Sequence, residues 1–176
     1  MSETPQTPPP PEPPPSGSGG ATGRPAGGGY NADQMKAAVT GANPYDLGLI
    51  AAGVLAFIFS LFSYYKYTAS AGGFSVSATW SAWHGFFGWF AAIVALAASA
   101  ALAAALFAKV KMPFPLRLSV LVAYAVSAVC VILALFVIPG GSATGLDKGH
   151  GIGYWISQIV ILGGTALAFL RKDATD

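Results

Sequence analysis

Four long stretches of the chain contain no charged residue, and this pattern constrains the fold more than any other feature of the sequence. They cover residues 47–65, 82–108, 118–138 and 152–170. In a helix the 19 residues of the first stretch extend about 28 Å, close to the roughly 30 Å of a bilayer's hydrocarbon core. None of the stretches has a continuous polar face, which excludes a soluble amphipathic bundle. We therefore predict four transmembrane helices.

The composition of the whole chain agrees with this prediction. Of its 176 residues, 54% are hydrophobic and only 9% are charged, whereas soluble domains carry roughly 25% charged residues. The net charge of +2 is too small to indicate a nucleic-acid partner. Cys130 is the single cysteine, so no internal disulfide can form. The sequence thus predicts an all-α membrane protein built as a four-helix transmembrane bundle.

The segment before the first helix differs from the rest of the chain. Residues 1–43 are rich in proline and glycine, and 8–15 are all proline except Glu12. Such a segment buries too little apolar surface to offset the entropy of ordering, so we expect a disordered tail with a short helix at 32–40. The transmembrane domain then covers 44–172, and residues 173–176 form the C-terminus.

The first helix has a clear start signal. Asn43 suits the N-cap, Pro44 suits the first helical position, and an acidic residue in the first turn suits the helix dipole. Asp46 occupies that turn. We interpret it as a capping residue, with an intramembrane carboxylate used in transport as the less favoured alternative.

The basic residues are distributed unevenly between the two sides that four spans define. Cytoplasmic loops carry an excess of Lys and Arg, and an even number of spans places both termini on one side. Seven basic residues fall on the side of the termini and two on the other. We therefore expect both termini in the cytoplasm. The seven are Arg24, Lys36, Lys109, Lys111, Arg117, Arg171 and Lys172, and the two are Lys66 and Lys148.

Small residues recur at about four-residue spacing along the predicted helices. In lipid, helices associate through close approach of their backbones, which small side chains permit. We interpret these residues as packing seams of a tight bundle; chance spacing in an alanine-rich chain is the alternative. The first helix carries Gly48, Ala52, Ala56 and Ser60, and the second carries Gly88, Ala91, Ala95, Ser99 and Ala103.

The chain lacks the motifs of an enzyme or of a cofactor protein. It has no serine elbow, no paired carboxylates at helical spacing, no CxxC and no phosphate-binding loop. The candidate metal ligands are His84, His150 and Asp147, all on the expected outer side, but they lack a ligand-spacing motif. We expect no enzyme activity, no cofactor and no bound metal ion.

Three sequence segments carry a resemblance to known proteins. They read Ala-Asn-Pro-Tyr-Asp-Leu-Gly before the first helix, Phe-Ser-Tyr-Tyr at its end and Ser-Ala-Trp-His-Gly-Phe-Phe-Gly-Trp at the second. Over about residues 42–172 the chain resembles uncharacterised actinobacterial membrane proteins with four transmembrane helices and a Pro/Gly-rich cytoplasmic tail. The resemblance implies a multi-pass protein of a bacterial plasma membrane. It brings no activity and no catalytic residues.

Three functions fit this pattern. The first is a non-enzymatic scaffold or accessory subunit that presents its proline-rich tail to a cytoplasmic protein; a tail that is only a spacer is the alternative. The second is a small transporter or channel component acting as an oligomer, although charged residues are absent from the middle of every span. The third is an envelope or respiratory-chain accessory with His84 and His150 at its outer face. The expected partners are the lipid bilayer, a cytoplasmic protein, and other membrane proteins or further copies of the chain, but no nucleic acid.

Overall fold

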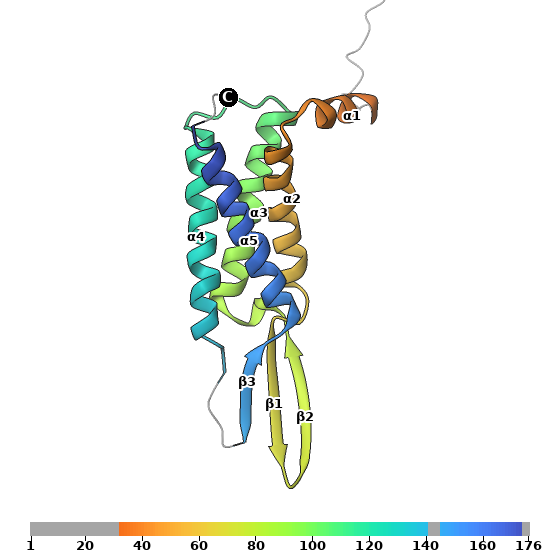
Figure 1. The fold of residues 1–176 in the computed structure, drawn as a ribbon, viewed down its shortest axis with the longest axis vertical. Helices are drawn as coiled ribbons and strands as arrows, with labels where there is room; N and C mark the ends of the chain where they lie inside the picture. Colours follow the sequence, from red (N-terminus) through yellow and green to blue (C-terminus); the bar gives the residue numbers. More distant parts are fainter. Residues whose placement is uncertain (1–31, 141–144, 174–176) are drawn as a thin grey trace, which may run out of the picture. The chain divides into compact units, whose positions relative to one another are not determined.

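The computed structural model describes residues 32–140 and 145–173, and four helices in it form a closed bundle (Figure 1). α2 packs against α3 and α5, and α4 packs against the same two helices on the other side. The helices of the described residues are α1 (Ala32–Gly41), α2 (Pro44–Ser60), α3 (Phe86–Phe107), α4 (Leu116–Phe136) and α5 (Ile152–Arg171). The part of the tail before residue 32, which includes the proline block, lies outside the described residues.

The length and the surface of the bundle suit a membrane. Among the described residues three helices, α3, α4 and α5, are long and apolar enough to cross a bilayer, one fewer than the four predicted, and α2, also apolar, has only 17 residues. The side chains that point away from the bundle are apolar as well. Val129 is 56% exposed and Ile159 is 71% exposed, as expected for residues that face lipid and not water.

A polar contact ties three helices together at the centre of the bundle. The hydroxyl of Tyr124 on α4 donates to the Leu49 carbonyl on α2 at 2.6 Å, and Ser99 Oγ on α3 lies 2.9 Å from the same oxygen. The two hydroxyl oxygens are 2.8 Å apart. All three residues are buried, so these bonds satisfy polar groups that would otherwise cost free energy in an apolar interior.

A three-stranded antiparallel sheet lies at the end of the bundle opposite the loop between α3 and α4 (Figure 1). Its strands are β1 (Tyr65–Ala71), β2 (Phe74–Trp80) and β3 (Leu146–His150), in the order β2-β1-β3. Gly72 and Gly73 join β1 to β2, and their φ angles of +57° and +86° are those of a tight type I′ hairpin turn. The described chain is mostly helical, as predicted, but the all-α prediction is wrong, because the segment after α2 and the segment before α5 pair as strands.

The sheet shifts the predicted helix boundaries. The first helix ends at Ser60 and not at residue 65, since the chain straightens and Tyr65 enters β1. The second begins at Phe86 and not at 82, after the short 3₁₀ helix η1 (Ala82–His84). α4 starts and stops two residues before the predicted 118–138, and α5 covers the predicted 152–170 with one residue more.

The start of α2 has the geometry that its sequence indicates. Asn43 is the N-cap and accepts a hydrogen bond from the Tyr45 amide through its side chain, and Pro44 occupies the first helical position. α1, at Ala32–Gly41, lies where a short helix was expected at 32–40.

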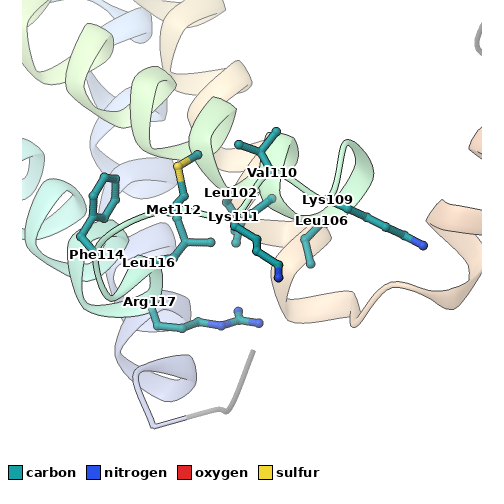
Figure 2. Close-up of a pocket in the computed structure, with 10 residues that line it drawn as sticks. Leu102, Leu106, Lys109, Val110, Lys111, Met112, Phe114, Leu116 and Arg117 are labelled. Carbon is teal, nitrogen blue, oxygen red and sulfur yellow. The ribbon is translucent and has the colours of Figure 1, made fainter. Parts of the chain in front are cut away.

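The loop of residues 108–115 connects α3 to α4 at the same end of the bundle as the start of α2. Lys109 has a φ of +52°, and the Val110 amide returns to the Ala104 carbonyl. This turn and the adjoining helix ends enclose an open pocket of about 620 Å³ (Figure 2). We refer to it as the loop pocket.

Candidate functional site

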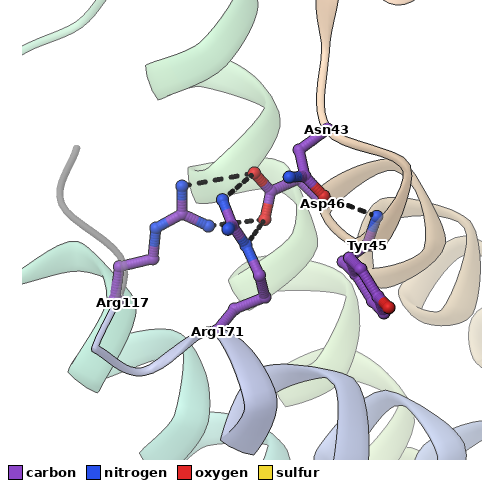
Figure 3. Close-up of polar contacts among 5 residues, drawn as sticks. All are labelled: Asn43, Tyr45, Asp46, Arg117 and Arg171. Atoms are coloured by element: carbon purple, nitrogen blue, oxygen red, sulfur yellow. Dashed lines mark hydrogen bonds and ion pairs between the residues drawn. The ribbon is translucent and has the colours of Figure 1, made fainter.

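One buried carboxylate and two arginines connect three helices at the end of the bundle that carries the loop pocket (Figure 3). Asp46 of α2 accepts from Arg117 Nη1 at 2.5 Å and Nη2 at 3.2 Å, and from Arg171 Nε at 3.2 Å and Nη2 at 3.1 Å. Arg117 lies in the first turn of α4, and Arg171 ends α5. We call these three residues the charged triad.

The geometry of the charged triad corrects the interpretation of Asp46 as a capping residue. Asn43 supplies the cap, whereas the Asp46 carboxylate points to the two guanidiniums. Its side chain is 2% exposed, and those of Arg117 and Arg171 are 10% and 22% exposed. Paired arginine–carboxylate bonds of this kind are directional and strong. Asp46 therefore clamps α2 to α4 and α5, and neither of its oxygens is left facing water.

The sequence contains one signal for the charged triad. Asp46, Arg117 and Arg171 all lie at helix ends that the cation bias assigns to one side of the membrane. An acidic residue next to an apolar core, as Asp46 is, needs a cationic partner. Which of the basic residues on that side pair with Asp46 depends on which helices are neighbours. Only the folded bundle shows which helices are neighbours.

At the other end of the bundle, backbone hydrogen bonds join the sheet to the helices. The Tyr64 amide donates to the Trp80 carbonyl at 2.8 Å, and the Tyr64 carbonyl accepts from the Gly151 amide at 2.9 Å. Gly153 of α5 donates to the Ser63 carbonyl at 2.8 Å. The link leaves no space for side chains, because a Cβ at Gly153 would lie 2.9 Å from the Ser63 carbonyl oxygen. The sheet is thus fixed to α2 and α5.

An aromatic cluster fills this junction. The rings of Tyr64 and Tyr154 meet edge to face at 5.2 Å between centroids, and Tyr64 meets Tyr65 at 5.0 Å. Burial raises the pKa of the Tyr65 hydroxyl to about 12 and also raises the pKa of Tyr64. Neither hydroxyl has a hydrogen-bond partner among the described residues. Both are therefore neutral at physiological pH and contribute by packing.

One face of the sheet, which we call the apolar face, is apolar apart from Lys148 and His150, and the other face is rich in hydroxyls. Strand alternation and register place Phe74 opposite Ala71 and Val76 opposite Ala69 on the first face. Thr68 and Ser77 pair across the second face, with 3.1 Å between their hydroxyl oxygens. Phe74 is 83% exposed and Val76 is 72% exposed. An open pocket of about 390 Å³ lies on the apolar face, lined by Ala69, Ser70, Ala71, Phe74, Val76, Gly145 and Leu146.

The structure does not gather the three candidate metal ligands. The His84 ring packs on Trp80 at 4.4 Å, next to β2, whereas the His150 ring packs on Tyr154 at 4.2 Å, next to β3. Strand alternation places Asp147 and His150 on opposite faces of the sheet. Within residues 32–140 and 145–173, no group of three or more His, Cys, Asp or Glu side chains is placed to hold a metal ion.

The residues of the predicted packing seams are mostly buried. Ala56, Ala91 and Ala95 have no exposed surface, and Ala52, Ser60, Gly88 and Ser99 are also buried. Gly48 and Ala103 are partly exposed. The closest approach involves Gly53, which the four-residue spacing did not select. A Cβ there would lie 2.6 Å from the Ala95 carbonyl oxygen and would clash with the Ser99 hydroxyl.

No protein-family model matches the chain, and no curated protein matches it either.

Proposed function

We propose that the chain is a multi-pass plasma-membrane protein with four spans that acts as a non-enzymatic accessory subunit or scaffold. The bundle anchors it, the sheet contacts a partner outside the membrane, and the proline-rich tail is available on the cytoplasmic side. The observation that carries the proposal is the exposed apolar face of a sheet fixed to the end of a membrane-type bundle. The absence of sequence motifs for catalysis agrees with a non-enzymatic role.

The fourth span in this proposal is α2. Its 17 residues extend about 26 Å, slightly less than the roughly 30 Å of a bilayer core. α2 packs along α3 and α5, and it begins beside the charged triad and ends beside the sheet. Flanking residues and local thinning of the bilayer accommodate a short helix at modest cost. If the bundle crosses the membrane, α2 therefore crosses it as well.

Labelling of single cysteines, each introduced into a Cys130→Ala chain, tests the orientation. The bias of basic residues places the termini and the 108–115 loop in the cytoplasm. In intact cells, a membrane-impermeant maleimide should label Ser70→Cys, at an exposed position on β1. Thr22→Cys and Thr175→Cys should react only after permeabilisation. External labelling of either terminal position would overturn the orientation.

The chemistry of the sheet indicates the kind of partner. A sheet with an exposed apolar face and a polar reverse face is typical of one that packs against another surface on its apolar side. Phe74 and Val76 stand beside small alanines, which leaves the shallow apolar pocket next to them. The sheet lies beyond the helix ends (Figure 1). We therefore assign the face to the extramembrane part of another membrane protein, engaged through its apolar side chains.

Site-specific photo-crosslinking in intact cells tests this assignment. A photoreactive phenylalanine analogue at Val76 should give one discrete adduct, identified by mass spectrometry as a protein with its own membrane spans. The same analogue at Ser77, one residue along β2 on the hydroxyl-rich face, is the matched control and should give none. The Val76 adduct should also disappear when Phe74 is replaced by Ser.

Three results would contradict the assignment. Equal crosslinking from Val76 and Ser77 would mean that the apolar face is not selective, and no adduct from either would mean that it has no partner. An adduct of two copies of this chain would mean that the face forms a homo-oligomer and does not bind a different membrane protein. On the described residues, no observation favours a transport pathway or a histidine site over the accessory role.

A further inference from the structure

The loop pocket combines basic side chains with an apolar floor. Three of its lining residues are basic and none is acidic. The others are apolar and come from the end of α3, the loop and the start of α4: Leu102, Ala105, Leu106, Val110, Met112, Phe114 and Leu116. A pocket of this composition suits a molecule that has both a negative group and a hydrocarbon part.

Two of the basic groups extend toward the same region. Figure 2 shows the Lys111 amine and the Arg117 guanidinium directed to one side of the pocket, whereas Lys109 extends away from it. Lys111 is exposed, and neither it nor Lys109 forms an ion pair with a described residue. Arg117 is held in place by Asp46.

The start of α4 adds to the positive potential. Pro115 is the N-cap and makes no side-chain capping bond, and the first turn of α4 contains no acidic residue. The positive end of the helix dipole and the first amides of the helix therefore lie beside Leu116 and Arg117, at the rim of the pocket. The helix end and the two side chains favour an anion at the same position.

We propose that the loop pocket binds one anionic phospholipid. Its phosphodiester lies between Lys111, Arg117 and the start of α4, and one acyl chain lies over the apolar lining. The pocket begins where α3 ends at Phe107 and α4 starts at Leu116, so it lies at the headgroup level of a bundle that spans the membrane. Basic pockets between transmembrane helices bind such headgroups. The inference rests on the membrane embedding proposed above and is independent of the partner of the sheet.

Native mass spectrometry of the purified full-length chain in detergent tests the proposal. Titration with dioleoyl-phosphatidylglycerol should give one tightly bound lipid, and dioleoyl-phosphatidylcholine, with the same chains and a neutral head, should bind at least fivefold more weakly. Lys111→Gln should weaken the phosphatidylglycerol complex roughly fivefold, the effect of one basic group near an anionic lipid. Lys172→Gln is the matched control, because its amine lies over the Phe169 ring, outside the pocket. It should change binding less than twofold.

Two further titrations test whether the pocket binds a soluble phosphate in place of a lipid. Glycerol 3-phosphate and inorganic phosphate carry the anionic head without acyl chains, and neither should compete with phosphatidylglycerol at equal concentration. Competition by either compound would mean that the pocket binds a soluble phosphate and not a lipid. Equal binding of the two lipids, or equal losses from Lys111→Gln and Lys172→Gln, would reduce the effect to general attraction and overturn the proposal. The purified chain contains no partner, so these results do not depend on photo-crosslinking at Val76.

Discussion

Asp46→Asn is expected to be among the most destabilising single substitutions in the bundle. The amide has nearly the volume of the carboxylate, so packing is kept, but Arg117 and Arg171 lose their common counter-ion. Removing one partner of a buried ion pair typically costs about 3–5 kcal/mol, because an uncompensated charge is left behind. For a chain of this size that corresponds to a decrease in melting temperature of roughly 6–20 °C. Thermal unfolding of the purified protein in detergent measures it.

Two further variants separate the charged triad from a general effect of charge. Lys172→Gln removes a charge next to Arg171 and should melt within about 2 °C of the wild type, as expected for an exposed surface group. A triple variant with Asp46→Leu, Arg117→Met and Arg171→Met should recover much of the lost stability, since apolar replacement of a whole buried network is often neutral. If Asp46→Asn melts like the wild type, the clamp between α2, α4 and α5 does not exist in solution.

Gly53→Ala is expected to separate α2 from α3. The added Cβ would lie 2.6 Å from the backbone carbonyl oxygen of Ala95, which cannot rotate away as a side chain can. Overpacking of this kind typically costs 1–3 kcal/mol, or roughly 2–12 °C in melting temperature. The shift of α2 should also break the contact between Ser99 and the Leu49 carbonyl.

Gly163→Ala is the matched control, because it makes the same chemical change within a transmembrane-type helix. A Cβ at Gly163 meets no atom within 4 Å, so only the better helix propensity of alanine remains, about 1 kcal/mol in favour of the folded state. The two variants should therefore shift the melting temperature in opposite directions. Shifts of the same sign and size would show that α2 and α3 do not approach closely at Gly53.

The helices were predictable because each carries its own signal. Uncharged length, the cap at Asn43 and the bounding Arg171 are all local features. Asn43 marks the start of α2, and the uncharged run that ends at Arg171 predicts α5 to within one residue. The start of β1 and its pairing with β3 were not predictable in this way. Tyr64 and Tyr65 extend an uncharged run and so resemble the end of a helix, yet their backbones pair with Trp80 and with the segment around His150. A pairing across about half of the chain leaves no trace in local hydrophobicity.

The charged triad was missed for a related reason. Asp46 occupies a first-turn position where an acidic residue has a sufficient local explanation through the helix dipole. Its actual partners are 71 and 125 residues away along the chain. Gly53 was missed because a strict four-residue spacing from Gly48 passes over it, although the helix places it at the α3 contact. In both cases the decisive information was which helices are neighbours.

The pairing of β1 with β3 has a consequence for the time course of biosynthesis. The β1–β2 hairpin can close within microseconds of its synthesis, because its turn is formed by Gly72 and Gly73. β3 is made much later: His150 follows its partner Tyr65 by about 85 residues, or roughly 4–17 s at 5–20 residues per second. In the proposed topology, β1 presents an unpaired edge outside the membrane during that interval, while α3 and α4 are still being inserted. The nascent chain therefore passes through a stage in which this edge can pair with another strand. This stage ends when β3 is synthesised and pairs with β1.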